Sequence, residues 1–459
     1  MALTASLDEI VAGGNALLAI KPHWKRVRLG DIGHVLNGYA FKAELFTRDV
    51  GMPLIRIRDV GSTASETFYS GDYDERYVVT AGDLLVGMDG DFNCARWRGP
   101  RSLLNQRVCK ITVDESLYLP RFLDYVLPGY LKAINDATSS ITVKHLSSRT
   151  IQEIPLPLPP MDEQREIVAE IEKQFSRLDE AVANLQCVKA NLKRYKAAVL
   201  KAAVEGRLVE TEASLAHREG RNYETGEQLL QRILKERKTK WTGKGKYAEP
   251  TVLELSSLPA LPDGWTWATA EAACDPVVDC HNKTAPYVSK GIPLVRTANI
   301  RDGQLLIEGM RFVDQPTYEF WSKRCPPAPG DVLFTREAPM GEACVVPAGM
   351  KICLGQRTML MRPSPAITAS FLLAALMSPV VSDLIGRVAV GSGVKHLRVG
   401  DVERLPIPLP PIAEQARIVA ELDLRLSVLR SVESEVDANL HRANSLRQAT
   451  LASAFQSGH

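Results

Sequence analysis

Two long runs of the sequence place apolar residues at intervals of three and four among polar ones, which is the pattern of one helix face. The first run starts near Ile167 and the second near Ile418. Neither run contains a proline, and no glycine occurs in them before Gly206 and Gly458. Seams of this length predict two long helices that pair as a coiled coil. Roughly 44 residues in each helix would make a rod of about 66 Å.

Both runs belong to a longer segment that the chain contains twice. Val143 opens VKHLSSRTIQEIPLPLPPMDEQREIVAEI, and Val394 opens VKHLRVGDVERLPIPLPPIAEQARIVAEL. The two copies align without a gap, so that Gln164 corresponds to Gln415. A repeat of this length determines the architecture and must be interpreted first. Two copies predict a chain built from two similar halves with approximate two-fold symmetry.

Each copy has the same internal order of elements. A short hydrophobic piece that alternates with prolines, Ile154 to Leu158 or Leu405 to Leu409, is predicted to form a strand. A pair of prolines closes that strand and tolerates a helix start directly after it. Asp162 is the expected N-cap of the first long helix.

The charge pattern indicates how the two helices pair. Acidic residues dominate positions 162–180, and basic residues dominate positions 189–207. The second copy is acidic before Asp437 and has Arg442 and Arg447 after it. Antiparallel pairing places the acidic start of each helix beside the basic end of the other. We therefore expect an antiparallel coiled coil within one chain.

The remaining sequence alternates short strands, broken by glycine and proline, with short helices, which predicts an α+β fold with two similar α/β domains. The first domain should contain strands in Pro53–Val60, Gly82–Met88 and Asn105–Val113 and a helix in Phe122–Ile134. The second domain echoes it, since Gly355-Gln-Arg357 parallels Asn105-Gln-Arg107. The predicted parts are an N-terminal helix (1–20), a first domain (21–155), a helical spacer (156–209), an exposed charged linker (210–258) that holds a helix at Thr225–Trp241, a second domain (259–406) and a second spacer (407–459).

Composition limits the class of protein. The 459 residues are 45% hydrophobic and 24% charged, which is ordinary for a globular protein. No apolar run reaches the roughly 18 residues of a membrane helix, and the N-terminal stretch lacks the basic flank of a signal peptide. Eight scattered cysteines without a C-x-x-C pair are typical of free thiols in the cytoplasm. Cys274, Cys280 and His281 lie close in sequence, but no second ligand pair follows at zinc-like spacing, so no metal site is predicted.

The sequence contains no recognisable catalytic motif. It has no phosphate-binding G-x-x-x-x-G-K-[ST] loop, and its Pro-Pro pairs do not fit the motif of an adenine methyltransferase. The histidines form no metal-binding pair at helical spacing. We predict that the chain binds no cofactor and is not an enzyme by itself.

Basic and amide side chains recur at matching places in the two domains and suit DNA recognition. Arginine grips guanine edges, glutamine and asparagine read adenine, and lysine holds phosphates. A single arginine could instead form a surface salt bridge, but placement in both halves favours a functional role. With a net charge of only +2, DNA binding needs a local patch. The candidate DNA-binding residues are Lys42, Arg56, Arg58, Arg96, Arg98, Arg101, Gln106, Arg107, Lys144, His145, Arg296, Asn299, Arg336, Gln356, Arg357, Lys395 and His396.

These features together resemble the specificity subunit of Type I restriction–modification systems. The resemblance rests on the paired VKHL…IPLPP…EQ segments, on GDLLVGMDGDFNCARWRG…NQRVCKI from Gly82 and on GDVLFTREAPMGEACVVP…GQRTMLM from Gly330. It covers nearly the whole chain. The first half has Asn105 where the second has Gly355, and the second half is poor in arginine between Arg311 and Arg336, so individual contacts to bases remain open.

The resemblance implies two target-recognition domains separated by two conserved helices, each domain reading one half of a bipartite site in double-stranded DNA. It also implies two methyltransferase subunits, which would use S-adenosylmethionine, and restriction subunits, which would use ATP and Mg²⁺. Two alternatives stay open at this point. One is a coiled-coil scaffold or regulator that binds protein partners without reading DNA, and the other is a stand-alone adenine methyltransferase with a fused recognition domain.

Overall fold

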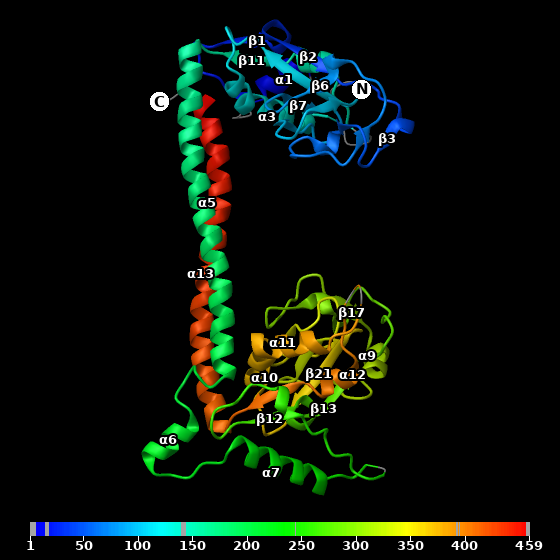
Figure 1. Ribbon diagram of the computed structural model, residues 1–459, viewed down its shortest axis with the longest axis vertical. Helices are drawn as coiled ribbons and strands as arrows, with labels where there is room; N and C mark the ends of the chain where they lie inside the picture. The colour runs from blue at the N-terminus through cyan, green and yellow to red at the C-terminus, as the bar shows by residue number, and fades with distance from the viewer. Residues whose placement is uncertain are drawn as a thin grey trace. The chain divides into compact units, whose positions relative to one another are not determined.

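The computed structural model describes residues 6–13, 18–138, 144–243, 245–391, 393 and 395–455 (Figure 1). The chain divides into two compact units. The first unit comprises Met1–Gln186 and Asp437–His459, and the second comprises Cys187–Val436. Each unit therefore contains one half of each of the two long helices, α5 (Met161–Val204) and α13 (Ile412–Phe455).

The first unit carries mostly short strands followed by two helices. Its further elements in chain order are α1 (Leu7–Ala12), β1 (Lys25–Arg28), α2 (Leu29–Ile32), β2 (Gly33–Asn37), β3 (Phe46–Thr47), β4 (Met52–Ile55), β5 (Phe68–Tyr69), β6 (Val78–Val79), β7 (Leu84–Gly87), β8 (Cys94–Arg96), β9 (Ser102–Leu104), β10 (Val108–Val113), α3 (Pro120–Asp136), α4 (Ser148–Gln152) and β11 (Pro155–Leu158).

The second unit repeats this order with additional helices. Its further elements are α6 (Glu212–Glu219), α7 (Gly226–Thr239), β12 (Thr266–Thr269), α8 (Ala270–Ala273), β13 (Cys274–Asp279), β14 (Ile292–Val295), β15 (Ile300–Arg301), β16 (Gln304–Leu305), β17 (Arg311–Val313), α9 (Gln315–Trp321), β18 (Val332–Thr335), β19 (Ala343–Val345), β20 (Cys353–Leu354), β21 (Thr358–Pro363), α10 (Ala369–Leu376), α11 (Pro379–Val388), α12 (Val399–Glu403) and β22 (Pro406–Leu409).

The antiparallel four-stranded sheet has the same topology in the two units, whereas the second sheet has five strands in the first unit and three in the second. An antiparallel sheet has the order β2-β10-β7-β8 in the first unit and β13-β21-β18-β19 in the second. A second sheet contains one parallel pair, β4 with β9 or β14 with β20. The proline-bearing strands β11 and β22 pair only with β1 and β12 in two-stranded sheets. Proline is tolerated there because one edge of each strand needs no ladder hydrogen bonds.

A buried glutamine in each unit joins the loop after β10 or β21 to the start of the long helix. Gln164 accepts from the Leu119 amide at 2.7 Å and donates to the carbonyls of Leu117 and Pro159 at 3.1 and 2.9 Å. Gln415 repeats this with the Thr368 amide at 2.8 Å and the carbonyls of Ala366 and Pro410 at 2.8 and 3.1 Å. Both glutamines are fully buried. The repeated Glu-Gln dipeptide is therefore a structural device that satisfies loop backbone groups away from water.

The glutamate before each glutamine accepts a hydrogen bond from a tryptophan. The surroundings of the two glutamates differ, however, and shift their pKa values in opposite directions. Trp24 donates to Glu163 at 2.9 Å, and Trp265 donates to Glu414 at 3.1 Å. Burial opposes ionisation of Glu163, but hydrogen bonds from Lys21, Trp24 and His23 outweigh it and lower its pKa to about 2. Burial dominates at Glu414 and raises its pKa.

The predicted antiparallel pairing of the long helices is confirmed within each unit (Figure 1). In the first unit Arg447 of α13 forms an ion pair with Asp179 of α5 and lies over the ring of Phe175, with its guanidinium carbon 4.9 Å from the ring centroid. In the second unit Leu200 of α5 shares a core with Leu422 of α13. The start of each helix thus lies beside the end of the other, and in the first unit a basic residue near the end of α13 pairs with an acidic residue of α5, as expected.

Most of the described residues in the charged run 235–249 are exposed, as the composition suggested, but the whole segment 210–258 is not an exposed linker. Leu229, Leu230 and Ile233 of α7 are buried in the core of the second unit. The helix itself was predicted correctly, since Thr225 and Gln228 form a capping box at its start. The composition misled because α7 is amphipathic and its apolar face is short.

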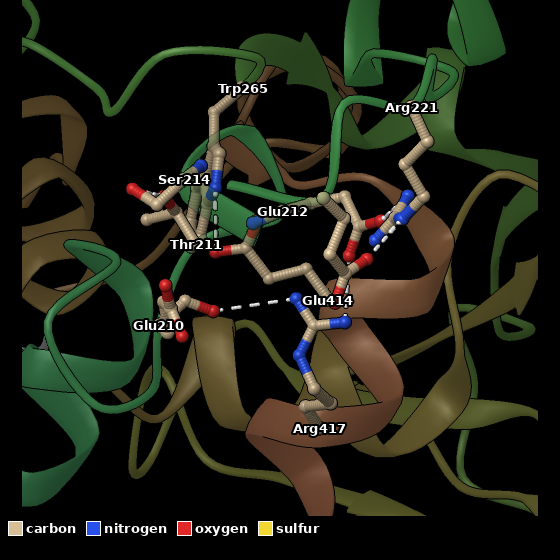
Figure 2. A network of polar contacts seen from close by, with 9 residues as sticks. Glu210, Thr211, Glu212, Ser214, Arg221, Trp265, Glu414 and Arg417 are labelled. Carbon is tan, nitrogen blue, oxygen red and sulfur yellow. Dashed lines mark hydrogen bonds and ion pairs between the residues drawn. The ribbon is translucent and has the colours of Figure 1, made fainter. Parts of the chain in front are cut away.

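A network of charges joins the start of α6 to the start of α13 (Figure 2). Arg417 and Arg221 bind opposite oxygens of the buried Glu212 at 2.7 and 2.6 Å. The amide of Glu212 donates to Glu414 at 2.8 Å. Burial would raise the pKa of Glu212, but the two arginines outweigh it and lower that pKa. Glu212 thus stays charged beside a carboxyl whose own pKa is raised.

Two further details differ from expectation. α5 already begins at Met161, so Asp162 lies in the first turn and is not the N-cap. The carbonyl of Pro160 accepts the first helical bond, from the Gln164 amide at 2.9 Å. At the N-terminus the described helix covers only Leu7–Ala12 of the residues 1–20 expected to be helical, and residues 1–5 and 14–17 lie outside the described ranges.

The opposite environments of Glu163 and Glu414 predict opposite pH effects. A lowered pKa in the folded state stabilises above the unfolded value of 4.5, and this contribution is lost as pH falls through about 2. A raised pKa contributes stability below 4.5 that is lost as pH rises through the folded value. At pH 7, Glu163→Gln should cost about 2–3 kcal/mol, and Glu414→Gln should cost less or stabilise.

Thermal unfolding of the two variants between pH 3 and pH 7 measures this difference. The deficit of Glu163→Gln should shrink toward pH 3, where wild-type Glu163 is protonated in the unfolded chain. Equal deficits for both variants at every pH would contradict the assigned environments.

Candidate nucleic-acid interface

A tight turn that carries an arginine joins the two sheets in each unit. Arg107 follows β9 and precedes β10, and Arg357 follows β20 and precedes β21. Both arginines have left-handed backbone, with φ of 71° and 70°. Such a turn position favours glycine, and another residue held there is strained. The same strained arginine in both units points to a role beyond folding.

The same backbone hydrogen bonds bring three loops together at this turn. In the first unit the Met88 amide donates to the Arg107 carbonyl at 2.8 Å, and the Leu146 amide donates to the Met88 carbonyl at 2.7 Å. In the second unit Arg336 takes the place of Met88, with matching bonds of 2.9 and 3.0 Å. The turn, the loop after β7 or β18 and the repeated Lys-His-Leu segment therefore form one surface in each unit.

An acidic side chain orients the turn arginine in both units. Asp89 lies 3.6 Å from the Arg107 guanidinium and 2.6 Å from Nδ1 of His145. Arg107 Nη1 also lies 3.1 Å from that nitrogen. In the second unit Glu337 lies 3.4 Å from the Arg357 guanidinium, and its backbone forms a bridge with His396. About half of each arginine side chain is exposed, 53% for Arg107 and 47% for Arg357.

The second unit brings three predicted residues around one hollow of about 240 Å³. Arg296, Gln356 and Arg357 line it together with Thr284 and Tyr287. Gln356 accepts a hydrogen bond from the Thr284 hydroxyl at 3.1 Å. Arg296 donates to the Gly309 carbonyl at 3.0 Å. Three candidate residues that are distant in sequence, Arg296 on one side and Gln356 and Arg357 on the other, therefore line the same hollow.

Other predicted residues have structural partners instead. Arg96 was expected to contact DNA, but its guanidinium is directed inward to Asp124 at 2.6 Å and to the Pro120 carbonyl at 3.0 Å. Asn299 was expected to read adenine, but it is buried and accepts from the Arg296 amide at 3.2 Å. Both side chains thus have partners within the chain in this structure, and their contact with DNA stays a prediction.

The remaining predicted residues are spread over the surface with various partners. Lys144 donates to the Asn135 side chain at 2.9 Å, and Arg336 donates to the Leu397 carbonyl at 3.1 Å. Arg58 lies 3.7 Å from Asp59, and Arg101 pairs with Glu75. The exposed side chains of this group are Lys42, Arg56, Arg58, Arg98, Arg101, Gln106 and Lys395.

Sequence reasoning missed the acidic and hydroxyl partners of the site. Asp89 and Glu337 occupy the same place after β7 and β18, and each binds the turn arginine of its unit. Thr284 orients Gln356 from the loop between β13 and β14. The acidic residues carried a detectable signal, since both follow the matched Gly-Asp strands, but only basic residues were sought.

Cys274 and Cys280, which lie close in sequence, are buried thiols. Burial raises the thiol pKa of Cys274 to about 12, and burial also raises that of Cys280. No group of three metal-ligating side chains occurs within the described ranges. Among the same residues no single helix has the length and apolar character to cross a membrane, although the bent pair α10 and α11 meets these criteria when taken together.

Comparison with known proteins identifies the class to which this fold and site belong. The family described as "Type I restriction modification DNA specificity domain" matches residues 22–191 and 310–425. The EcoBI Type I restriction enzyme specificity subunit of Escherichia coli is 34% identical over 451 residues, covering 96% of this chain and 87% of that protein. The EcoKI specificity subunit of Escherichia coli strain K12 is 22% identical, covering 94% and 88%.

A solved structure shares the fold. One chain from a study of complex assembly and conformational transition of the type I R-M system has a TM-score of 0.60 at 20% identity, and the match covers 95% of this chain and 99% of that one. The chain therefore belongs to the Type I restriction–modification specificity subunits. This family membership favours a non-catalytic DNA specificity subunit over the scaffold and the stand-alone methyltransferase.

The inward position of Arg96 predicts that its loss acts on stability. Arg96→Ala would leave Asp124, whose Oδ1 is already buried without a partner, short of its closest donor. Asp124 would keep only the more distant Arg121, at 3.4 Å, and the loss of the closer partner of a mostly buried carboxylate should cost about 1–3 kcal/mol. Chemical unfolding should show that loss, and Arg98→Ala, an exposed neighbour, should show almost none. If Arg96→Ala instead leaves stability unchanged and weakens DNA binding, Arg96 contacts DNA and this prediction is wrong.

Proposed function

We propose that this chain reads a bipartite DNA sequence, with one half-site bound by the turn surface of each unit. The observation that supports this most strongly is the strained arginine turn, which recurs in both units with an acidic partner while the loops around it differ. Side chains on variable loops over a common scaffold suit two readers of different sequences. Arg107 and Arg357, half exposed and oriented, would contact base edges, and Lys144 and Lys395 would approach phosphates.

The methyltransferase subunits would dock on the long helices. In the second unit Leu424, Val428 and Val432 form a stripe along α13, one helical turn apart, and are 61, 58 and 39% exposed. Apolar side chains on a helix that already has a partner on another face are typical of a further helix-packing surface. Each of two methyltransferase subunits would bring S-adenosylmethionine, and restriction subunits would bring ATP and Mg²⁺. The chain itself would supply sequence recognition.

Exchange of the recognition segments tests the assignment of one half-site to each unit. Residues 21–155 are replaced by those of another specificity subunit, the complex with methyltransferase is reconstituted, and methylated adenines are mapped. One half of the site should change and the other should persist, and replacing residues 259–406 should give the complementary result. Methylation by the chain alone should be undetectable. A change of both halves, or of neither, would refute the modular assignment.

The length of the long helices should set the gap between the half-sites. Four residues are inserted after Gln186 in α5 and after Val436 in α13, the two places where the units divide. Paired insertions are needed because four residues restore the helical seam only approximately. The helices lengthen by about 6 Å, and at roughly 3.4 Å per base pair the gap should grow by one to two base pairs.

The methylated sequence is again the measurement, and both half-site sequences should stay unchanged. Two added base pairs rotate one half-site by roughly a fifth of a turn, so some loss of affinity is expected. Retained activity with an unchanged gap would mean that the helices join the units without setting the spacing.

A further inference from the structure

The hollow in the second unit depends on a glycine. Gly355 packs so close to the end of the neighbouring strand β14 that a Cβ there would lie 2.7 Å from the Val295 carbonyl oxygen and 3.1 Å from Cγ of Arg296. The first unit has Asn105 at the matching position, with its side chain buried. The glycine allows the arginine turn to approach Arg296, so that Arg296, Gln356 and Arg357 line the same space.

The nitrogen-bearing side chains of this hollow present hydrogen-bond donors. The carbonyl oxygen of Gln356 already accepts from the Thr284 hydroxyl at 3.1 Å, which leaves its amide N–H groups for a ligand. Arg357 is 47% exposed and oriented by Glu337. Arg296 has a buried Nε without an acceptor in the described structure. Guanidinium groups have no acceptor atoms, so these three residues together select a surface of acceptors.

Among the base edges in the major groove, only guanine offers two neighbouring acceptors, N7 and O6. Adenine and cytosine each present an amino donor there, and thymine presents one acceptor and a methyl group. We propose that this hollow receives the major-groove edge of a guanine, with Arg357 and Gln356 as the residues that determine specificity. This inference rests on the proposed function and names the base that one half-site must contain.

Two variants separate reading from folding. Arg357→Gly removes the guanidinium at a position whose φ of 70° suits glycine, so the turn should fold at least as well. Thr284→Val removes the hydroxyl that occupies the Gln356 carbonyl oxygen, which then becomes free to accept from the amino group of adenine. Arg387→Ala, an exposed arginine of α11, is the matched control.

The full chain is reconstituted with its methyltransferase, and methylated sites are mapped for each variant. The half-site governed by residues 259–406 should contain a guanine. Replacing it by 7-deazaguanine should weaken wild-type binding about tenfold or more and should weaken Arg357→Gly binding no further. Thr284→Val should accept adenine at that position, and Arg387→Ala should match wild type.

The outcomes distinguish this inference from the function on which it rests. A specific bipartite site whose second half lacks guanine, or full discrimination against 7-deazaguanine by folded Arg357→Gly, would overturn the guanine assignment and leave the proposed function standing. Methylation without any sequence preference would overturn both.

Discussion

The structure depends on the Glu-Gln dipeptide at the start of each long helix, in which the glutamine is fully buried. Gln164 and Gln415 each satisfy one amide and two carbonyls in loops that would otherwise be buried without partners. An unsatisfied buried backbone group costs roughly 1–3 kcal/mol. Three such contacts in each unit therefore stabilise the packing of the loop after β10 or β21 against the start of the long helix. The neighbouring glutamates add a tryptophan contact in each unit. This junction explains why the proline-rich segment recurs almost unchanged.

The two junctions reach the same geometry with different charges. In the first unit Lys21 forms an ion pair with Glu163 and His23 forms a hydrogen bond with it, and in the second unit Pro262 and Gly264 stand at the equivalent places before the tryptophan. There the charged partners come from elsewhere, because Glu212 and Arg417 meet beside Glu414. In the first unit Lys21 pairs with Glu163 itself, whereas in the second unit Glu212, the first residue of α6, pairs with Arg417 next to Glu414. The scaffold is retained although its electrostatic support differs.

Much of the fold could be predicted because its signals are local. The apolar seams predicted α5 and α13, the charge pattern predicted their direction, and the capping box predicted α7 at Thr225. What failed depends on contacts distant in sequence. The inward direction of Arg96 is set by Asp124, and the burial of α7 is set by the core of the second unit. The spacing of apolar residues along the chain does not show which distant residues will be in contact.

The candidate DNA-binding site could likewise be predicted only in part from the sequence. The turn arginines could be chosen from the sequence because Gln106-Arg107 and Gln356-Arg357 recur at matched positions. Their left-handed backbone, their acidic partners and the hollow beside Gly355 needed the structure. Asn299 shows the converse, since a residue type suited to reading adenine is used to brace a loop. Residue chemistry selects candidates, and only geometry shows which of them have donors left for DNA.

The central claim is that one chain carries two related readers of DNA. The most direct measurement is a genome-scale map of methylated adenines produced by the unmodified chain with its methyltransferase subunits. Two different short sequences separated by a gap of constant length are predicted, with one methylated adenine in each. A single continuous sequence, or two half-sites at variable spacing, would contradict the claim that each unit recognises its own half of the site.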